Sequence, residues 1–134
     1  MRRVLVADED RHVLSRVRAL LRAEGLDVVA VDDGNLVFPL LDREDFDLVI
    51  LDIFMRGVDG LDTIRLFRKR HPDVPVIAMS ALEFPETSDA PPDFLAMATR
   101  LGAKGGLRKP FDGQHLQSMV RRCLGVAEPN RHDC

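Results

Sequence analysis

The chain lacks most of the features that would cross-link a protein, export it or hold it in a membrane. Its 134 residues include two cysteines, Cys123 within a helical pattern and Cys134 at the last position. This spacing fits neither a disulfide framework nor a zinc site. The apolar stretch after Arg3 is too short for the core of a signal peptide, and no apolar run approaches the roughly eighteen residues that span a bilayer. We therefore expect a protein of the reducing cytoplasm without membrane contact.

An excess of positive charge is also missing. The formal net charge is -3, whereas proteins that bind nucleic acid hold the phosphate backbone with clustered, excess Lys and Arg. The basic run over residues 65–70 is explained as the solvated end of a helix, where the helix dipole favours positive charge. We expect no direct binding of nucleic acid.

The length and the apolar content of 46% suit one domain with a single core. Short apolar runs alternate with longer amphipathic segments, which is typical of βαβ units and a parallel sheet. We predict strands over residues 4–7, 27–31, 48–51, 76–79 and 106–108, and helices from 13 to near 25 and over 34–41, 61–70, 94–101 and 113–124. Pro39 lies beyond the first turn of the second predicted helix and should kink or shorten it. Residues 1–126 form the predicted domain, and residues 127–134 a mobile tail.

Polar residues stand at the ends of four predicted strands. Asp8, Glu9 and Asp10 follow the first strand, Asp52 the third, Ser80 the fourth and Lys109 the fifth. Because parallel strands bring their carboxyl ends to the same edge of a sheet, we expect these side chains to converge where open α/β folds bind ligands.

This set of residues suits phosphoryl transfer. A carboxylate can attack a phosphoryl group and form an acyl phosphate when cations offset the repulsion between the two anions. Asp52 is the candidate nucleophile, Lys109 can supply positive charge, and the Ser80 hydroxyl can donate a hydrogen bond to a phosphoryl oxygen. Magnesium takes one or two protein carboxylates, and Asp8 and Glu9 are placed to supply them. The sequence thus predicts a magnesium-assisted phosphorylation site.

In these motifs the sequence resembles the receiver domain of two-component response regulators. The resemblance rests on residues 4–10, 46–55, 59–61, 80–81 and 102–111 and covers nearly the whole chain. It implies a flavodoxin-like, doubly wound α/β fold whose five-stranded parallel sheet has the order 2-1-3-4-5. It also implies that Asp52 accepts a phosphoryl group from a histidine kinase or histidine phosphotransfer protein, and that the bond before Pro110 is cis. The implied ligands of Mg2+ are Asp8, Glu9, Asp52 and the backbone carbonyl of Phe54.

The sequence departs from the family pattern at four places. The acidic pair is Asp-Glu where the family more often has Asp-Asp or Glu-Asp, so Asp10 could share the role of Glu9 as a ligand. Arg56 replaces a proline that is usual after the acceptor, and Gly106 stands where the fifth strand usually has an aromatic residue. Residues 83–92, with three prolines, make a longer connection than usual. This connection is either a functional loop over the strand ends or a tolerated insertion.

We expect a stand-alone receiver, because the eight-residue tail is too short for an output domain. It would be a phosphoacceptor that assists its own phosphorylation and dephosphorylation, and not an enzyme in the usual sense. It would signal to a downstream protein partner by contact or by phosphorelay. An alternative, suggested by Glu9 and Gly106, is an interaction module that works without phosphorylation. A magnesium-dependent phosphohydrolase is disfavoured, because such enzymes commonly place a second Asp two residues after the nucleophile, where this chain has Phe54.

Overall fold

The structure, a computed structural model, describes residues 1–55, 59–81 and 93–126. Three of the sequence-based expectations concern other parts of the chain. The turn at Arg56, the proline-containing segment 83–92 and the expected tail 127–134 lie outside the described residues.

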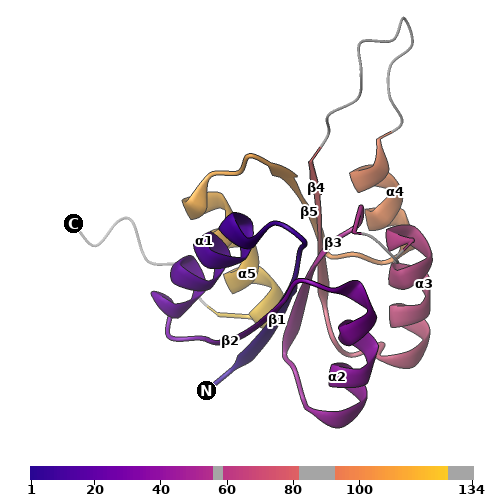
Figure 1. Cartoon of the computed structure of the whole chain (residues 1–134), viewed down its shortest axis with the longest axis horizontal. Coiled ribbons are helices and arrows are strands. Elements are labelled where there is room, and N and C mark those ends of the chain that lie inside the picture. Colours follow the sequence, from indigo (N-terminus) through magenta and orange to yellow (C-terminus); the bar gives the residue numbers. More distant parts are fainter. Residues whose placement is uncertain (56–58, 82–92, 127–134) are drawn as a thin grey trace, which may run out of the picture.

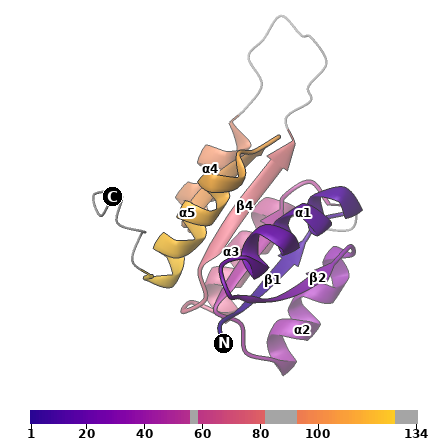
Figure 2. The same cartoon turned by 90° about the vertical axis from the view of Figure 1, so that its left-hand side faces the viewer.

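Within the described residues, five parallel strands form one sheet in the order β2-β1-β3-β4-β5. The strands are β1 (Arg3–Ala7), β2 (Asp27–Val31), β3 (Leu48–Asp52), β4 (Val76–Ala81) and β5 (Gly105–Lys109). The helices are α1 (Arg11–Arg22), α2 (Val37–Arg43), α3 (Gly60–Arg70), α4 (Phe94–Leu101) and α5 (Gly113–Leu124). Helices α1 and α5 cover one face of the sheet, and α2, α3 and α4 cover the other (Figures 1 and 2). The predicted flavodoxin-like α/β fold and its strand order are confirmed.

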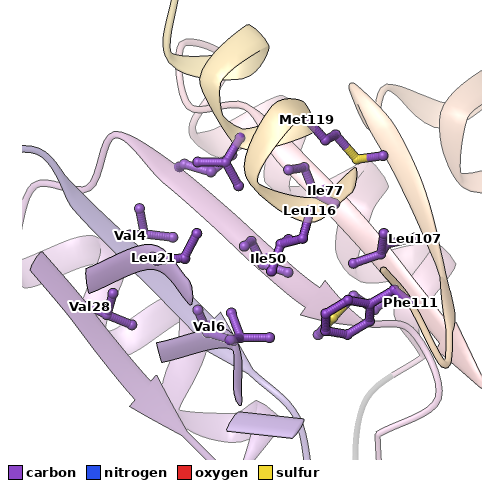
Figure 3. Close-up of a cluster of buried hydrophobic side chains, with 14 of the residues drawn as sticks. Val4, Val6, Leu21, Val28, Ile50, Ile77, Leu107, Phe111, Leu116 and Met119 are labelled. Atoms are coloured by element: carbon purple, nitrogen blue, oxygen red, sulfur yellow. The ribbon is translucent and has the colours of Figure 1, made fainter. Parts of the chain in front are cut away.

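Both faces of the sheet are buried, and each strand supplies side chains to both. Consecutive residues of a strand point to opposite faces. Val6 and Ile50 lie in the cluster under α1 and α5, together with Leu116 of α5 (Figure 3). Leu51 points the other way and lies in a second cluster with Phe67 of α3. The unbroken apolar runs of the central strands follow from this double burial.

Aspartates begin four of the helices. The side chains of Asp10, Asp59, Asp93 and Asp112 each accept hydrogen bonds from backbone N–H groups in the first turn of α1, α3, α4 and α5. Asp93 and Asp112 stand directly before the helices predicted over residues 94–101 and 113–124, and a cap at each of them agrees with those predicted starts. The predicted stop at Gly25 is also confirmed, since this residue has a φ of 78°, in the left-handed region that favours glycine.

The prediction that Pro39 lies beyond the first turn of the second helix was wrong. A 3-10 turn, η1 (Gly34–Leu36), is capped by Asp33, and α2 begins only at Val37. Pro39 is therefore the third residue of α2, in the first turn, where a backbone N–H has no partner within the helix. With Pro39 in its first turn, α2 continues as far as Arg43, so the proline neither kinks nor ends the helix.

All of the described helices are short. The longest, α1 and α5, have twelve residues each. None of the helices in the described ranges is long and apolar enough to cross a membrane.

Candidate functional site

Three charged side chains from different strands meet at one edge of the sheet. Asp8 directly follows β1, Asp52 is the last residue of β3, and Lys109 is the last residue of β5. The Lys109 side chain reaches across the end of β4, which lies between β3 and β5. Its Nζ atom lies 2.5 Å from Asp8 Oδ2 and 2.9 Å from Asp52 Oδ2. The ammonium group thus bridges the two carboxylates.

The alternation of side chains along the strands explains why these three residues meet. Each lies two positions beyond a residue of the α1 and α5 face: Asp8 beyond Val6, Asp52 beyond Ile50, and Lys109 beyond Leu107. Ser80 lies two positions beyond Ala78, which belongs to the opposite face. Ser80 therefore reaches the same edge from the α4 side. We call these four residues, Asp8, Asp52, Ser80 and Lys109, the strand-end site.

Backbone hydrogen bonds fix the two carboxylates. Asp8 Oδ1 accepts a hydrogen bond of 2.8 Å from the backbone N–H of Asp10. Asp52 Oδ1 accepts one of 2.8 Å from the backbone N–H of Phe54. Aspartate commonly bonds the backbone two residues on in this way. In both residues one carboxylate oxygen faces the backbone, and the other faces Lys109.

Burial makes the charges of this site costly. Asp8 is 1% exposed and Asp52 is 8% exposed. Burial raises the pKa of Asp8, and its pairing with Lys109 offsets only part of that rise. Burial lowers the pKa of Lys109, but pairing with Asp8 and Asp52 raises it by more, so that the net pKa of Lys109 is raised. When all three groups are ionised, two negative charges face one positive charge, which favours a further cation.

Ser80 presents a buried hydroxyl to the same edge. The residue is fully buried, and its Oγ has no hydrogen-bond partner among the atoms of the described residues. A buried hydroxyl without a partner costs about 1 to 3 kcal/mol. A phosphoryl oxygen bound at the strand-end site would give this hydroxyl an acceptor.

The residues predicted to hold magnesium are only partly brought together. Asp8 and Asp52 meet through Lys109, whereas Glu9 is exposed. In the part of the chain that the structure describes, no three His, Cys, Asp or Glu residues are grouped so that they could hold a metal ion. Magnesium needs only one or two protein carboxylates, the rest of its ligands being waters and phosphate oxygens. The buried pair Asp8 and Asp52 fits that requirement, and ligation by Glu9 and by the Phe54 carbonyl stays a prediction.

Asp10 has a different role from the one considered for it. Its Oδ1 accepts hydrogen bonds from the backbone N–H groups of His12 at 2.8 Å and Val13 at 3.4 Å. The carboxylate is thus engaged as the N-cap of α1. This engagement counts against Asp10 as a metal ligand.

Two contacts that the sequence did not suggest lie beside the site. The Arg16 guanidinium of α1 donates a hydrogen bond of 2.7 Å to the Phe111 carbonyl and lies 4.6 Å from the centroid of its ring. The ring of Phe54 meets the ring of Phe94 edge to face, with centroids 5.0 Å apart and planes at 90°. Both contacts join residues that are far apart in the sequence, so no local pattern indicates them.

Two backbone features near the site, the bond before Pro110 and the position of Gly106, were singled out from the sequence. The Lys109–Pro110 bond is cis, as the resemblance implied. At Gly106, a Cβ atom would lie 3.1 Å from the Cβ of Leu95 on α4. A side chain at this position of β5 would therefore press on Leu95, which would have to shift by a few tenths of an ångström.

Comparison with known proteins relates the chain to one family. A sequence model of the response regulator receiver domain matches residues 4–121. The response regulator protein FleR of Pseudomonas aeruginosa is 36% identical over 132 residues, which make up 98% of this chain and 26% of FleR. The transcriptional regulatory protein CpxR of Escherichia coli is 33% identical over 124 residues, 92% of this chain and 50% of CpxR. The chain thus spans about a quarter to a half of the length of these relatives.

Solved structures with the same fold are receivers as well. A response regulator receiver protein from Burkholderia phymatum superposes with a TM-score of 0.78 at 31% identity, covering 97% of this chain and 100% of that one. The receiver domain of the Francisella response regulator 1452 gives a TM-score of 0.80 at 25% identity, covering 93% of this chain and 98% of that one.

Proposed function

The chain belongs to the response regulator receiver family, and from this we propose that Asp52 accepts a phosphoryl group from a phosphohistidine of a histidine kinase or histidine phosphotransfer protein. The observation that carries the proposal is the strand-end site itself. It presents a buried carboxylate held by a bridging lysine, beside a buried hydroxyl without a partner in the described residues.

The reaction moves the phosphoryl group from nitrogen to oxygen. A carboxylate oxygen of Asp52 attacks the phosphorus, and the new P–O bond forms as the P–N bond to the imidazole breaks. The other ring nitrogen of the phosphohistidine carries a proton, and the electron pair of the P–N bond stays on the nitrogen that held the phosphorus. The histidine therefore leaves as a neutral imidazole, and Asp52 becomes an acyl phosphate. The attack needs positive charge near the two anions.

Residues of the strand-end site have separate tasks in this step. Lys109, already 2.9 Å from Asp52 Oδ2, pairs with the incoming phosphoryl oxygens and neutralises part of their charge. Ser80 Oγ donates a hydrogen bond to a phosphoryl oxygen. Magnesium, when bound, supplies further positive charge, and Asp8, Glu9, Asp52 and the Phe54 carbonyl would hold it.

A small phosphodonor tests the proposal. The wild-type protein is incubated with acetyl phosphate and magnesium chloride, and covalent phosphate is measured by intact mass. We expect one added phosphate in the wild type and none in Asp52→Asn, because the near-isosteric amide cannot act as the nucleophile. Asp73→Asn is the matched control, since Asp73 is exposed and precedes β4 at the opposite edge of the sheet. Unchanged phosphate uptake in Asp52→Asn would refute the assignment of the acceptor.

The same assay separates the two other functions. A wild-type protein that takes up no phosphate would favour an interaction module that works without phosphorylation, which Glu9 and Gly106 suggest. Repeated turnover of phosphate esters would indicate a phosphohydrolase. The proposal predicts neither result.

We also propose that the phosphorylated chain signals by contact with a downstream protein or by passing the phosphoryl group on. FleR and CpxR are longer than their matching segments, so action without an output domain stays a prediction. The mass of the natural polypeptide in its own cells tests that prediction directly.

A further inference from the structure

Phe54 links the acceptor residue to α4 through two contacts on one side of the sheet. Its backbone N–H donates the 2.8 Å hydrogen bond to Asp52 Oδ1. Its ring contacts Phe94, the first residue of α4, edge to face at a centroid distance of 5.0 Å. One residue therefore contacts the acceptor carboxylate with its backbone and a helix with its side chain.

The Phe54 ring has room to change its position. It is 46% exposed, which is unusual for so large an apolar side chain beside a buried site. A groove of about 510 Å³ runs along the connection between β3 and α3, with Phe54 and Phe94 among its lining residues. A ring at the wall of such a groove can turn without opening the core.

A connection from the site to α4 through the side chain at position 106 of β5 is missing in this chain. Ser80 lies two positions beyond Ala78, and Ala78 pairs with Gly106 on β5. Gly106 has no side chain to move, and the position of its missing Cβ is covered by Leu95 at 3.1 Å. A side chain of β5 therefore cannot carry a change from Ser80 to α4 at this point.

We propose that the Phe54–Phe94 pair transmits phosphorylation of Asp52 to α4, a coupling that rests on the proposed function of Asp52. Phosphorylation turns the Asp52 carboxylate into an acyl phosphate. This weakens Oδ1 as an acceptor for the Phe54 N–H, while phosphoryl oxygens become available as competing acceptors. Phe54 then shifts its backbone, its ring moves against Phe94, and α4 takes a new position or a new stability. Two discrete arrangements of this pair would make α4 the responding element.

The test compares the response of α4 in variants of the pair. Wild type, Phe94→Leu, Phe54→Leu and the double variant are treated with acetyl phosphate and magnesium chloride, and intact mass gives the phosphorylated fraction. Amide hydrogen exchange is then followed at residues 98–101 of α4, beyond the substituted positions. The change in exchange is expressed per phosphorylated molecule, so a variant that takes up less phosphate is still comparable.

We expect Phe94→Leu to take up phosphate as the wild type does, while its α4 response falls by about two- to tenfold, the factor that one aromatic pair accounts for. Phe54→Leu should lose a similar share, and the double variant no more than either single one, because both substitutions break the same contact. Phe38→Leu is the matched control. It makes the same change in another aromatic pair, with Phe67, and should leave the α4 response unchanged.

The outcomes separate the coupling from the phosphorylation on which it rests. A full α4 response in Phe94→Leu, or additive losses in the double variant, would overturn the coupling while Asp52 remained the acceptor. A wild type that takes up no phosphate would overturn the proposed function and the coupling with it. Should Phe54→Leu fail to fold, Phe94→Leu with its control still decides the question.

Discussion

The two helical layers of the molecule are joined to the strand-end site in different ways. On the α1 and α5 side, the Arg16 guanidinium holds the carbonyl of Phe111, two residues after Lys109. The Gln117 side chain of α5 donates a 3.0 Å hydrogen bond to the Leu20 carbonyl of α1. These are directional polar bonds: the first fixes the segment after Lys109 to α1, and the second fixes α5 to α1.

On the α3 and α4 side, the described link to the site is a contact between rings. Phe54 meets Phe94 edge to face, and Leu95 packs against the backbone of Gly106. Large apolar side chains on this side, such as Met97 and Leu66, are exposed. Dispersion contacts have little directional preference and allow sliding. The α1 and α5 layer thus positions the site, and the α4 side is the one that we propose responds to it.

Truncating a leucine to alanine in each layer should give the largest difference in the loss of unfolding free energy. Leu116 of α5 is fully buried, whereas Leu95 of α4 is half-buried. We expect Leu116→Ala to lower the free energy of unfolding by about 2 to 5 kcal/mol, and Leu95→Ala by roughly 1 kcal/mol. Urea denaturation measures both values. Equal losses would contradict the difference between the layers.

A ring at residue 106 should disturb the α4 side specifically. In Gly106→Phe the new side chain meets Leu95, and the overpacking should cost about 1 to 3 kcal/mol of unfolding free energy. Adding Leu95→Ala should restore part of this loss, because the truncation makes room for the ring. Urea denaturation of the single and double variants gives the interaction energy. The absence of any rescue would show that Leu95 is not the obstacle.

Removal of the Arg16 guanidinium should loosen the fixed side. Arg16→Ala loses the hydrogen bond to the Phe111 carbonyl and the cation–π contact, together worth about 1 to 2 kcal/mol. We also expect slower phosphate uptake from acetyl phosphate, because Lys109 is held less firmly. Arg65→Ala is the control, since Arg65 is exposed and pairs with the equally exposed Asp62 of the same helix. It should change the unfolding free energy by less than about 0.5 kcal/mol. Uptake at the wild-type rate in Arg16→Ala would show that the helix contact does not position Lys109.

The smallest expected effect is a change in the pH dependence of stability when the charge of Asp8 is removed. Burial raises the pKa of this group above its ordinary value of 3.8, so the folded protein disfavours the carboxylate relative to the unfolded chain. As the pH rises above that ordinary value, the unfolded chain ionises first and the wild type loses stability. Asp8→Asn, without this titration, should gain stability relative to the wild type as the pH rises from about 4 to 7. Denaturation at several pH values checks the sign. If Asp8→Asn instead lost stability relative to the wild type as the pH rose, pairing with Lys109 would outweigh burial in setting the pKa of Asp8.

Much of the fold and of the site could be predicted from the sequence, because the signals are local. The apolar runs of β1 and β3, the caps at Asp93 and Asp112, and the turn at Gly25 all depend on residues within a few positions of one another. Polar residues at the ends of parallel strands must come to one edge. This rule alone brings Asp8, Asp52 and Lys109 together.

Other features depend on how one helix packs against another element, and these were decided by the tertiary structure. The late start of α2 places Pro39 in the first turn, and the packing of α4 on Gly106 places Phe94 beside Phe54. No short-range pattern contains this information, because helix positions follow from the packing of whole layers on the sheet. The sequence by itself therefore determined the order of elements and the acidic and basic groups of the site. Packing between distant segments decided which helix holds Lys109 in place and which one contacts the acceptor residue through a ring.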